Sequence, residues 1–131
     1  MQISRKTIEI WKINVIFENI EVKNINIKGK DSLIRIAPII FKGLSLIFTS
    51  GVYYQVKMSL GAIFSINSNT DYFGLENSNF TFNKGRIFQF TPTDIANTYN
   101  QLSASVLNST FYSNSGEDAL IYISGNSKVT I

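Results

Sequence analysis

Two nine-residue stretches of the chain are nearly the same, and they lie 31 positions apart. Residues 77–85 read NSNFTFNKG, and residues 108–116 read NSTFYSNSG. Both stretches keep Asn-Ser, Phe, Asn and Gly at the same offsets. A spacing of this length is typical of solenoid proteins, in which each repeat forms one coil and packs on the next. The repeat therefore predicts a wound chain with stacked coils.

Apolar residues elsewhere alternate in short runs, which indicates strands rather than helices. In residues 15–27, VIFENIEVKNINI, the apolar side changes parity at Glu18-Asn19 and again at Lys23-Asn24. A strand that changes parity must bend if its apolar side chains are to face one core. Asn favours such corners because it tolerates left-handed backbone. These residues therefore predict three short strands and two polar corners within one coil.

The same pattern returns along the chain at an uneven spacing. Residues 41–46 repeat the pattern of residues 17–22, which aligns Phe41, Leu44 and Leu46 with Phe17, Ile20 and Val22. Successive repeats are thus separated by about 24, then about 34, then about 31 residues, a drift that is typical of solenoids with insertions in their loops. The register between residues 44 and 75 stays open. Residues 91–105 alternate so weakly that we expect a loop projecting from the coil.

Stacked coils place equivalent residues about one strand spacing apart, roughly 4.8 Å. We therefore expect the two Phe residues of the repeat to stack in the core, and its corner asparagines to bond each other through their side-chain amides. Gly85 and Gly116 would then allow positive φ at the next turn. The candidate ladder residues are Phe80, Phe111, Asn83, Asn114, Asn77 and Asn108.

Short motifs in these repeats resemble a known family. Residues 80–83 (FTFN) and 111–114 (FYSN) are similar to the FxxN repeats of polymorphic outer-membrane proteins and related right-handed parallel β-helices. Residues 61–63 (GAI) resemble the companion GGAI motif with one Gly lost, and residues 118–121 (DALI) are a more degraded copy. The stretch from residue 108 to the end also resembles repeats of large protist surface proteins with a pectin-lyase-like fold, including those of ciliates.

This resemblance covers residues 14–131 and implies a fold. We predict an all-β protein that forms a right-handed parallel β-helix of about four to five coils. Residues 1–131 would form a single β-helix segment of a longer chain, with residues 1–13 as a cap or lead-in strand. Because solenoid ends expose unpaired strand edges, we expect protein partners or further coils to cover them.

The residue content argues against several kinds of chemistry. The chain has no Cys and no His, so it lacks the usual thiol nucleophile and the commonest general base. Its acids are scattered except for Glu117 and Asp118, and neighbours on a strand point to opposite faces. We therefore predict no enzyme, with no catalytic, cofactor-binding or metal-binding residues. A Ca²⁺ site at Asp118 and a corner Asn is the alternative, but such a cation needs six or more oxygen ligands.

Charge is unevenly distributed but mild. Residues 1–42 contain eight Lys or Arg and four acids, a balance of +4, whereas the remaining residues carry −1. We interpret the lysines as solvated strand residues, and the chain shows no recognisable nucleic-acid-binding module. Nucleic acid is therefore not an expected partner.

No apolar run reaches the roughly 18–20 residues that cross a bilayer, so no transmembrane segment is predicted. The first residues do not form a signal peptide. Asn79 and Asn108 each begin an N-glycosylation sequon, which makes them candidate acceptors if the chain is secreted. An extracellular or cell-surface location is our prediction, and an intracellular assembly is the alternative.

Aromatic residues other than Phe could form a sugar-stacking face if they were exposed together, although core packing is the reading we favour. They are Trp11, Tyr53, Tyr54, Tyr72, Tyr99, Tyr112 and Tyr122. The leading functional prediction is a structural or interaction role, as a rigid β-solenoid segment of a surface or filamentous assembly. The alternatives are a carbohydrate-binding or polysaccharide-cleaving module and an intracellular assembly subunit.

Overall fold

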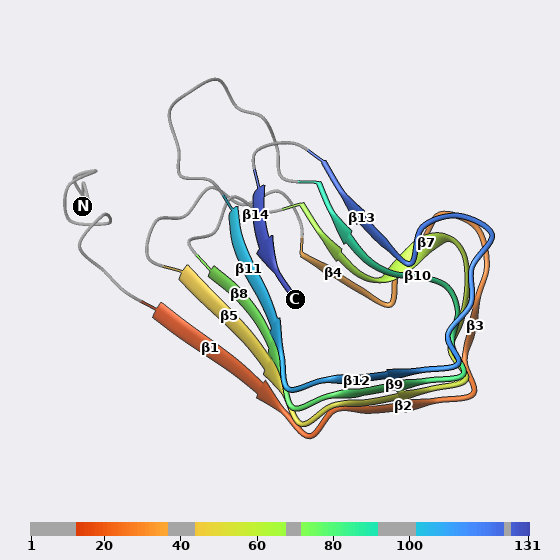
Figure 1. The fold of residues 1–131 in the computed structure, drawn as a ribbon, viewed down its shortest axis with the longest axis horizontal. Coiled ribbons are helices and arrows are strands. Elements are labelled where there is room, and N and C mark those ends of the chain that lie inside the picture. The colour runs from red at the N-terminus through yellow and green to blue at the C-terminus, as the bar shows by residue number, and fades with distance from the viewer. Residues whose placement is uncertain (1–12, 37–43, 68–71, 92–101, 125–126) are drawn as a thin grey trace, which may run out of the picture.

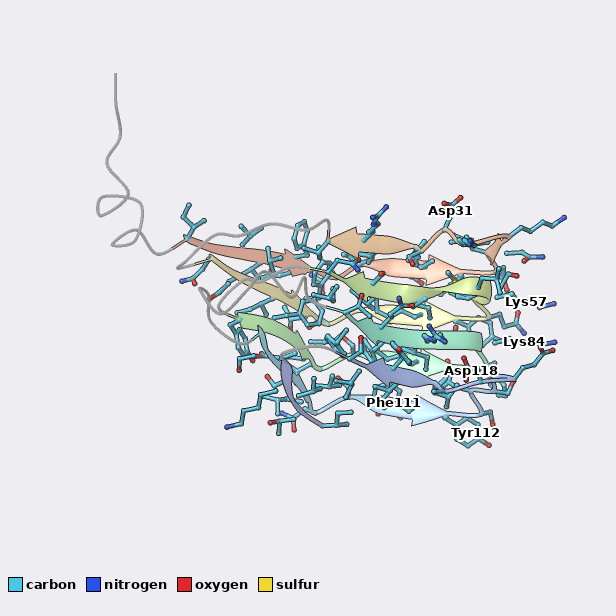
Figure 2. The ribbon with its side chains drawn as sticks, turned by 90° about the horizontal axis from the view of Figure 1, so that it is seen from above. Asp31, Lys57, Lys84, Phe111, Tyr112 and Asp118 are labelled. Atoms are coloured by element: carbon cyan, nitrogen blue, oxygen red, sulfur yellow. The ribbon has the colours of Figure 1, made fainter. Side chains whose placement is uncertain are left out.

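The structure, a computed structural model, describes residues 13–36, 44–67, 72–91, 102–124 and 127–131. Within these ranges the regular structure is all β-strand, and the paired strands run parallel. The chain passes along three sides in turn and returns to the first side one level further along (Figure 1). Seen from above, the levels lie over one another (Figure 2). The prediction of an all-β, parallel, solenoid-like architecture is confirmed.

Each side of the stack is one sheet. The first sheet holds β1 (Ile13–Glu18), β5 (Leu44–Thr49), β8 (Tyr72–Glu76), β11 (Leu102–Leu107) and β14 (Ser127–Thr130), in that order. The second holds β2 (Glu21–Lys23), β6 (Val52–Tyr54), β9 (Asn79–Thr81) and β12 (Thr110–Tyr112). The third holds β3 (Asn26–Ile27) and β4 (Ile34–Ile36), both beside β7 (Lys57–Ile66), followed by β10 (Lys84–Phe90) and β13 (Ile121–Ile123). The described strands thus make four coils and the first strand of a fifth.

Two corners in every coil use left-handed backbone. The first corner has φ between 46° and 58°, at Asn19, Ser50, Asn77 and Asn108. The second has φ between 51° and 56°, at Asn24, Gln55, Phe82 and Ser113. The corners predicted at Asn19 and Asn24 are therefore confirmed. The corner amides are satisfied across coils, since Asn19 N–H donates to the Thr49 carbonyl at 3.1 Å and Asn24 N–H to the Tyr54 carbonyl at 3.0 Å.

Aromatic side chains form the centre of the core. Phe17 stacks on Phe48 with ring centroids 4.7 Å apart, and Phe64 stacks on Phe88 at 5.7 Å. Phe64 and Phe88 are fully buried. Each such pair adds about 0.5–1.5 kcal/mol beyond the burial of its apolar area. The core is therefore built from rings that repeat at the spacing of the coils.

The register pairs on the first sheet show that the coils differ in length. Along this sheet the partners are Ile13↔Leu44, Ser45↔Tyr72, Ser103↔Tyr72 and Leu102↔Ser127. Fewer residues separate the partners Ser45 and Tyr72 than separate Ile13 from Leu44 or Tyr72 from Ser103. The separation between Leu102 and Ser127 is the smallest of the four. These pairs also settle the register between residues 44 and 75.

The predicted alignment of residues 41–46 with residues 17–22 is wrong. Leu44 lies beside Ile13, not Ile20, and Phe48 rather than Phe41 lies at the level of Phe17. The alternation of apolar residues is compatible with Phe41 or with Phe48 as the partner of Phe17. Only pairing with Phe48 also places the left-handed corner at Ser50 over the one at Asn19. Corner geometry therefore decides the register.

Three further expectations need correction or fall outside the described residues. Residues 102–105 of the predicted loop belong to β11, while residues 92–101 lie outside the described residues. The predicted cap also lies outside them, apart from Ile13, which begins β1. Gly85 has φ of 97°, as expected, but Gly116 does not have positive φ, so that expectation is wrong for Gly116.

Candidate functional site

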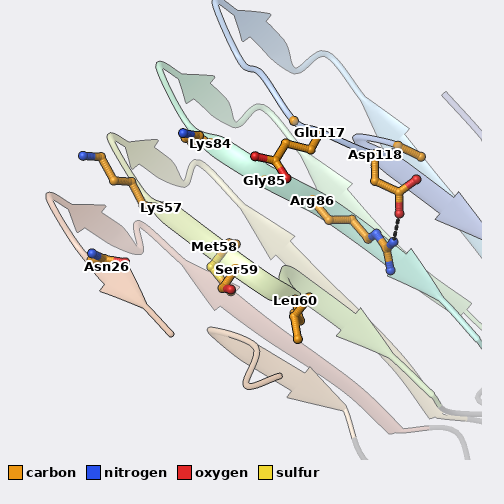
Figure 3. A pocket seen from close by; sticks show the side chains of 13 residues that line it. Asn26, Lys57, Met58, Ser59, Leu60, Lys84, Gly85, Arg86, Glu117 and Asp118 are labelled. Carbon is orange, nitrogen blue, oxygen red and sulfur yellow. Dashed lines mark hydrogen bonds and ion pairs between the residues drawn. The ribbon is translucent and has the colours of Figure 1, made fainter. Parts of the chain in front are cut away.

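The third sheet carries a groove of about 430 Å³ where its strands begin (Figure 3). It arises because the coils differ in length here. From the pair Lys57↔Lys84, the next pair Ala62↔Arg86 lies five residues on in β7 but two residues on in β10. Along this stretch the third coil also has fewer residues than the fourth, since Lys84 and Phe88 pair with Ser115 and Ile121. The third coil is therefore recessed here between its two neighbours. We call this hollow the lysine groove.

Two lysines lie at one end of the lysine groove. Lys57 and Lys84 are register partners on β7 and β10, and both side chains are exposed. Figures 2 and 3 show them on neighbouring coils at the same corner of the stack. Like charges that face each other across strands repel. Among the described residues neither lysine takes part in a salt bridge. The pair therefore concentrates positive charge where the groove opens.

Arg86 lies at the other end of the groove, and its interactions are internal. Its Nη2 donates to Asp118 Oδ2 at 2.6 Å and its Nη1 to Gln89 Oε1 at 2.8 Å. The guanidinium carbon lies 4.9 Å from the centre of the Tyr122 ring. The Arg86 side chain is 18% exposed, whereas that of Asp118 is 79% exposed. Arg86 therefore serves to tie the third coil to the fourth.

This ion pair also bears on the predicted acids. Glu117 and Asp118 both line the groove, but Asp118 is bound to Arg86 rather than to a second carboxylate. The described residues contain no group of three or more acids that could hold a metal ion. The charged side chains that line the groove offer ion pairing and hydrogen bonding.

The ladder phenylalanines are brought together as stacked rings. Phe80 and Phe111 are register partners with centroids 5.0 Å apart and planes at 2°. Tyr53 extends the stack on the other side, 4.6 Å from Phe80. Phe80 is fully buried, but Phe111 is 39% exposed. The expectation that Phe111 lies inside the core is therefore wrong, because the outer face of its ring is not covered by the described residues.

Asn83 and Asn114 are joined through their side chains. Asn83 Nδ2 donates to Asn114 Oδ1 at 3.0 Å and to the Tyr53 carbonyl at 3.0 Å, while Asn83 Oδ1 accepts from Val56 N–H at 2.9 Å. Asn114 Nδ2 repeats the pattern by donating to the Phe80 carbonyl at 2.9 Å. The left-handed residue is the one just before each Asn. The ladder Asn therefore fastens the corner without being the residue that bends it.

Asn77 and Asn108 occupy equivalent left-handed corners, with φ of 50° and 46°. The hydrogen-bonded column at this corner is formed by the serines that follow them. Ser78 Oγ accepts from Gly51 N–H at 3.1 Å, and Ser109 Oγ accepts from Ser78 N–H at 3.2 Å. This serine ladder was not predicted from the sequence, although the Asn-Ser pair shared by residues 77–78 and 108–109 was its signal. Asn favours the left-handed backbone at this corner, and the following Ser supplies the bond between coils.

The two sequon asparagines are both exposed but are not equivalent. Asn108 lies at a corner, while Asn79 lies in β9 at the level of Thr110. Both side chains are therefore accessible on the outside of the second sheet and its corner.

Three aromatic rings, two exposed and one half-buried, form a row at the other end of the strands of the second sheet. Phe82 packs edge-on between Tyr54, at 5.9 Å, and Tyr112, at 5.6 Å. Phe82 is 49% exposed and has φ of 55°, a left-handed conformation that is rare for a bulky residue. We call these three residues the outer aromatic row. Tyr53, in contrast, belongs to the core, and Trp11 and Tyr99 lie outside the described residues.

The basic first third contributes a second, shallower hollow of about 390 Å³ lined by Lys30, Asp31 and Arg35. The negative charge of Asp31 partly offsets the positive charges of Lys30 and Arg35 in this hollow. The described residues include no helix long and apolar enough to cross a membrane.

Comparisons with protein families, with curated proteins and with solved structures find no match for this chain. Its functional assignment therefore depends on the geometry described above.

Proposed function

We propose that this chain is a structural and interaction protein, a rigid segment of a right-handed parallel β-helix in a cell-surface or filamentous assembly. The handedness and the likeness to pectin-lyase-like repeats belong to this proposal. In the described residues, stacked rings link each of the four coils to the next, as in Phe17–Phe48, Tyr53–Phe80 and Phe80–Phe111.

The observation that carries the proposal is the uncovered end of the aromatic stack. Phe80 is fully buried, but Phe111, one coil further on, is 39% exposed. Ile123, on the edge strand β13 of the third sheet, is 47% exposed. Parallel edge strands with an apolar face pair readily with another strand. We infer that further coils or a protein partner cover this end, as solenoids require.

Sedimentation velocity over a wide range of protein concentration tests this role. We expect the chain to associate as its concentration rises, because the uncovered edges of one copy offer a surface for another. Phe111→Lys should weaken association at least tenfold by placing a charge on that face. Leu60→Lys is the matched control, since Leu60 is 65% exposed but lies on the wall of the lysine groove.

Association that is unchanged by Phe111→Lys would contradict the proposal, as would a monomer at all concentrations that binds a polysaccharide. That second result would favour a carbohydrate-binding or polysaccharide-cleaving module, the alternative function. The outer aromatic row supports this alternative, since the exposed rings of Phe82 and Tyr112, beside the half-buried Tyr54, are suited to stacking on sugars. Replacing Phe82 with Ser would then abolish sugar binding.

The extracellular location is part of the proposal and has its own test. Intact mass of the native protein, before and after enzymatic removal of N-glycans, reports whether Asn79 or Asn108 is modified. A fall in mass supports a secreted glycoprotein. An unchanged mass, with both asparagines recovered unmodified, favours an intracellular assembly subunit.

A further inference from the structure

We propose that Lys57 and Lys84 bind a sulfate or phosphate oxyanion at the end of the lysine groove. The two residues are register partners on neighbouring parallel strands, so their backbones lie about 4.8 Å apart. Both side chains are exposed and lysine side chains are long and flexible, so their two ammonium groups can be brought onto one tetrahedral anion, to which both can donate. The inference does not depend on the assembly role proposed above.

Charge around the pair favours an external anion. Within the described part of the chain no acid forms a salt bridge with either lysine, and the nearby Asp118 is taken up by Arg86. Glu117 is the remaining carboxylate of the groove, on the wall formed by the fourth coil. An anion between the lysines would replace their mutual repulsion with two attractive contacts, while Glu117 would oppose it.

The shape of the groove makes the lysines accessible. Gly116 lines it without a side chain, and even a Cβ there would meet nothing closer than 3.4 Å, so this wall leaves the recess open. At Gly85 a Cβ would lie 2.6 Å from the Met58 carbonyl oxygen, so glycine is needed there for the close approach of two coils. The volume of about 430 Å³ exceeds that of a single tetrahedral ion, which leaves room for a substituent on the anion. The ligand chemistry is therefore a sulfate or phosphate group, either free or as a small ester.

Two-dimensional amide NMR of the whole chain tests the site. Sodium phosphate and sodium sulfate are titrated at constant ionic strength, with sodium chloride alone as the reference. We expect saturable shifts of the Gly85 and Gly116 amides. Lys57→Met and Lys84→Met should each weaken binding about fivefold, the scale of one exposed charge contact.

The controls separate the site from general charge. Lys23→Met removes the same charge from β2, where Lys23 pairs with Glu21, and should leave the affinity unchanged. Glu117→Gln should strengthen binding. Non-saturable shifts equal to those in chloride, or equal weakening by Lys23→Met and Lys84→Met, would overturn the proposal. Glucose 6-phosphate then distinguishes the source: tighter binding than phosphate supports an ester ligand, and equal binding supports the free ion.

Discussion

The asparagine ladder offers the sharpest test of what fastens the coils. Asn83 is 1% exposed, and its side chain bonds the Val56 N–H, the Tyr53 carbonyl and Asn114 Oδ1. Asn83→Ala removes all three bonds and leaves the Val56 N–H and Tyr53 carbonyl without these partners in the core. A buried polar group that loses its partner costs about 1–3 kcal/mol. With two such groups left in the core, we expect the free energy of unfolding to fall by about 3–5 kcal/mol.

The equivalent asparagine of the next coil, Asn114, should contribute less to stability than Asn83. Asn114 makes the same bond to a carbonyl, that of Phe80, but it is only half-buried in the last complete coil. Water can replace its bonds there, so Asn114→Ala should cost about 1–2 kcal/mol. Asn79→Ala, on the exposed face of β9, should change stability by less than about 0.5 kcal/mol.

Urea denaturation followed by circular dichroism measures all three variants. The slope with urea should stay constant, so that the midpoint reports stability. The reasoning is refuted if Asn83→Ala costs less than about 1 kcal/mol. Equal costs at Asn83 and Asn114 would refute the part of the argument that rests on burial.

Two further substitutions test the packing of the core and of the first two coils. The buried Tyr53 hydroxyl finds no hydrogen-bond partner in the described part of the chain, so Tyr53→Phe should raise the free energy of unfolding by about 1 kcal/mol. Burial also raises the pKa of Tyr53, so the unfolded chain loses this proton at lower pH than the folded chain, and the free energy of unfolding falls as pH rises above about 10. In a series of urea melts at increasing pH, Tyr53→Phe should show a smaller fall in stability above about pH 10. A destabilised Tyr53→Phe would contradict the first statement, and an unchanged loss of stability above about pH 10 in the variant would contradict the second. Gly61→Ala would place a Cβ 2.0 Å from the Asp31 carbonyl oxygen, and we expect a thermal melt to show a loss of about 2–3 kcal/mol. Gly116→Ala, whose Cβ would meet nothing closer than 3.4 Å, is its control, and equal losses would argue against the steric explanation.

Several features of the fold could be predicted because they depend on local chemistry. The parity changes at Glu18-Asn19 and Lys23-Asn24 mark the corners, since a short strand must bend to keep its apolar side inward. Phe80 and Phe111 share a repeat position, and they stack for that reason. The candidate site is different, because Lys57 and Lys84 look like ordinary exposed lysines until the length of each coil is known.

The sequence by itself determined that this chain is all β, that its strands are short, and where its repeated phenylalanines and asparagines meet. These properties follow from side-chain alternation and from residues that tolerate a left-handed corner. Tertiary structure alone decided the register of the second coil, the exposure of Phe111 and the recess of the third coil between its neighbours. Each of these depends on how many residues separate one corner from its equivalent in the next coil, and therefore on contacts between residues that lie a whole coil apart in the sequence.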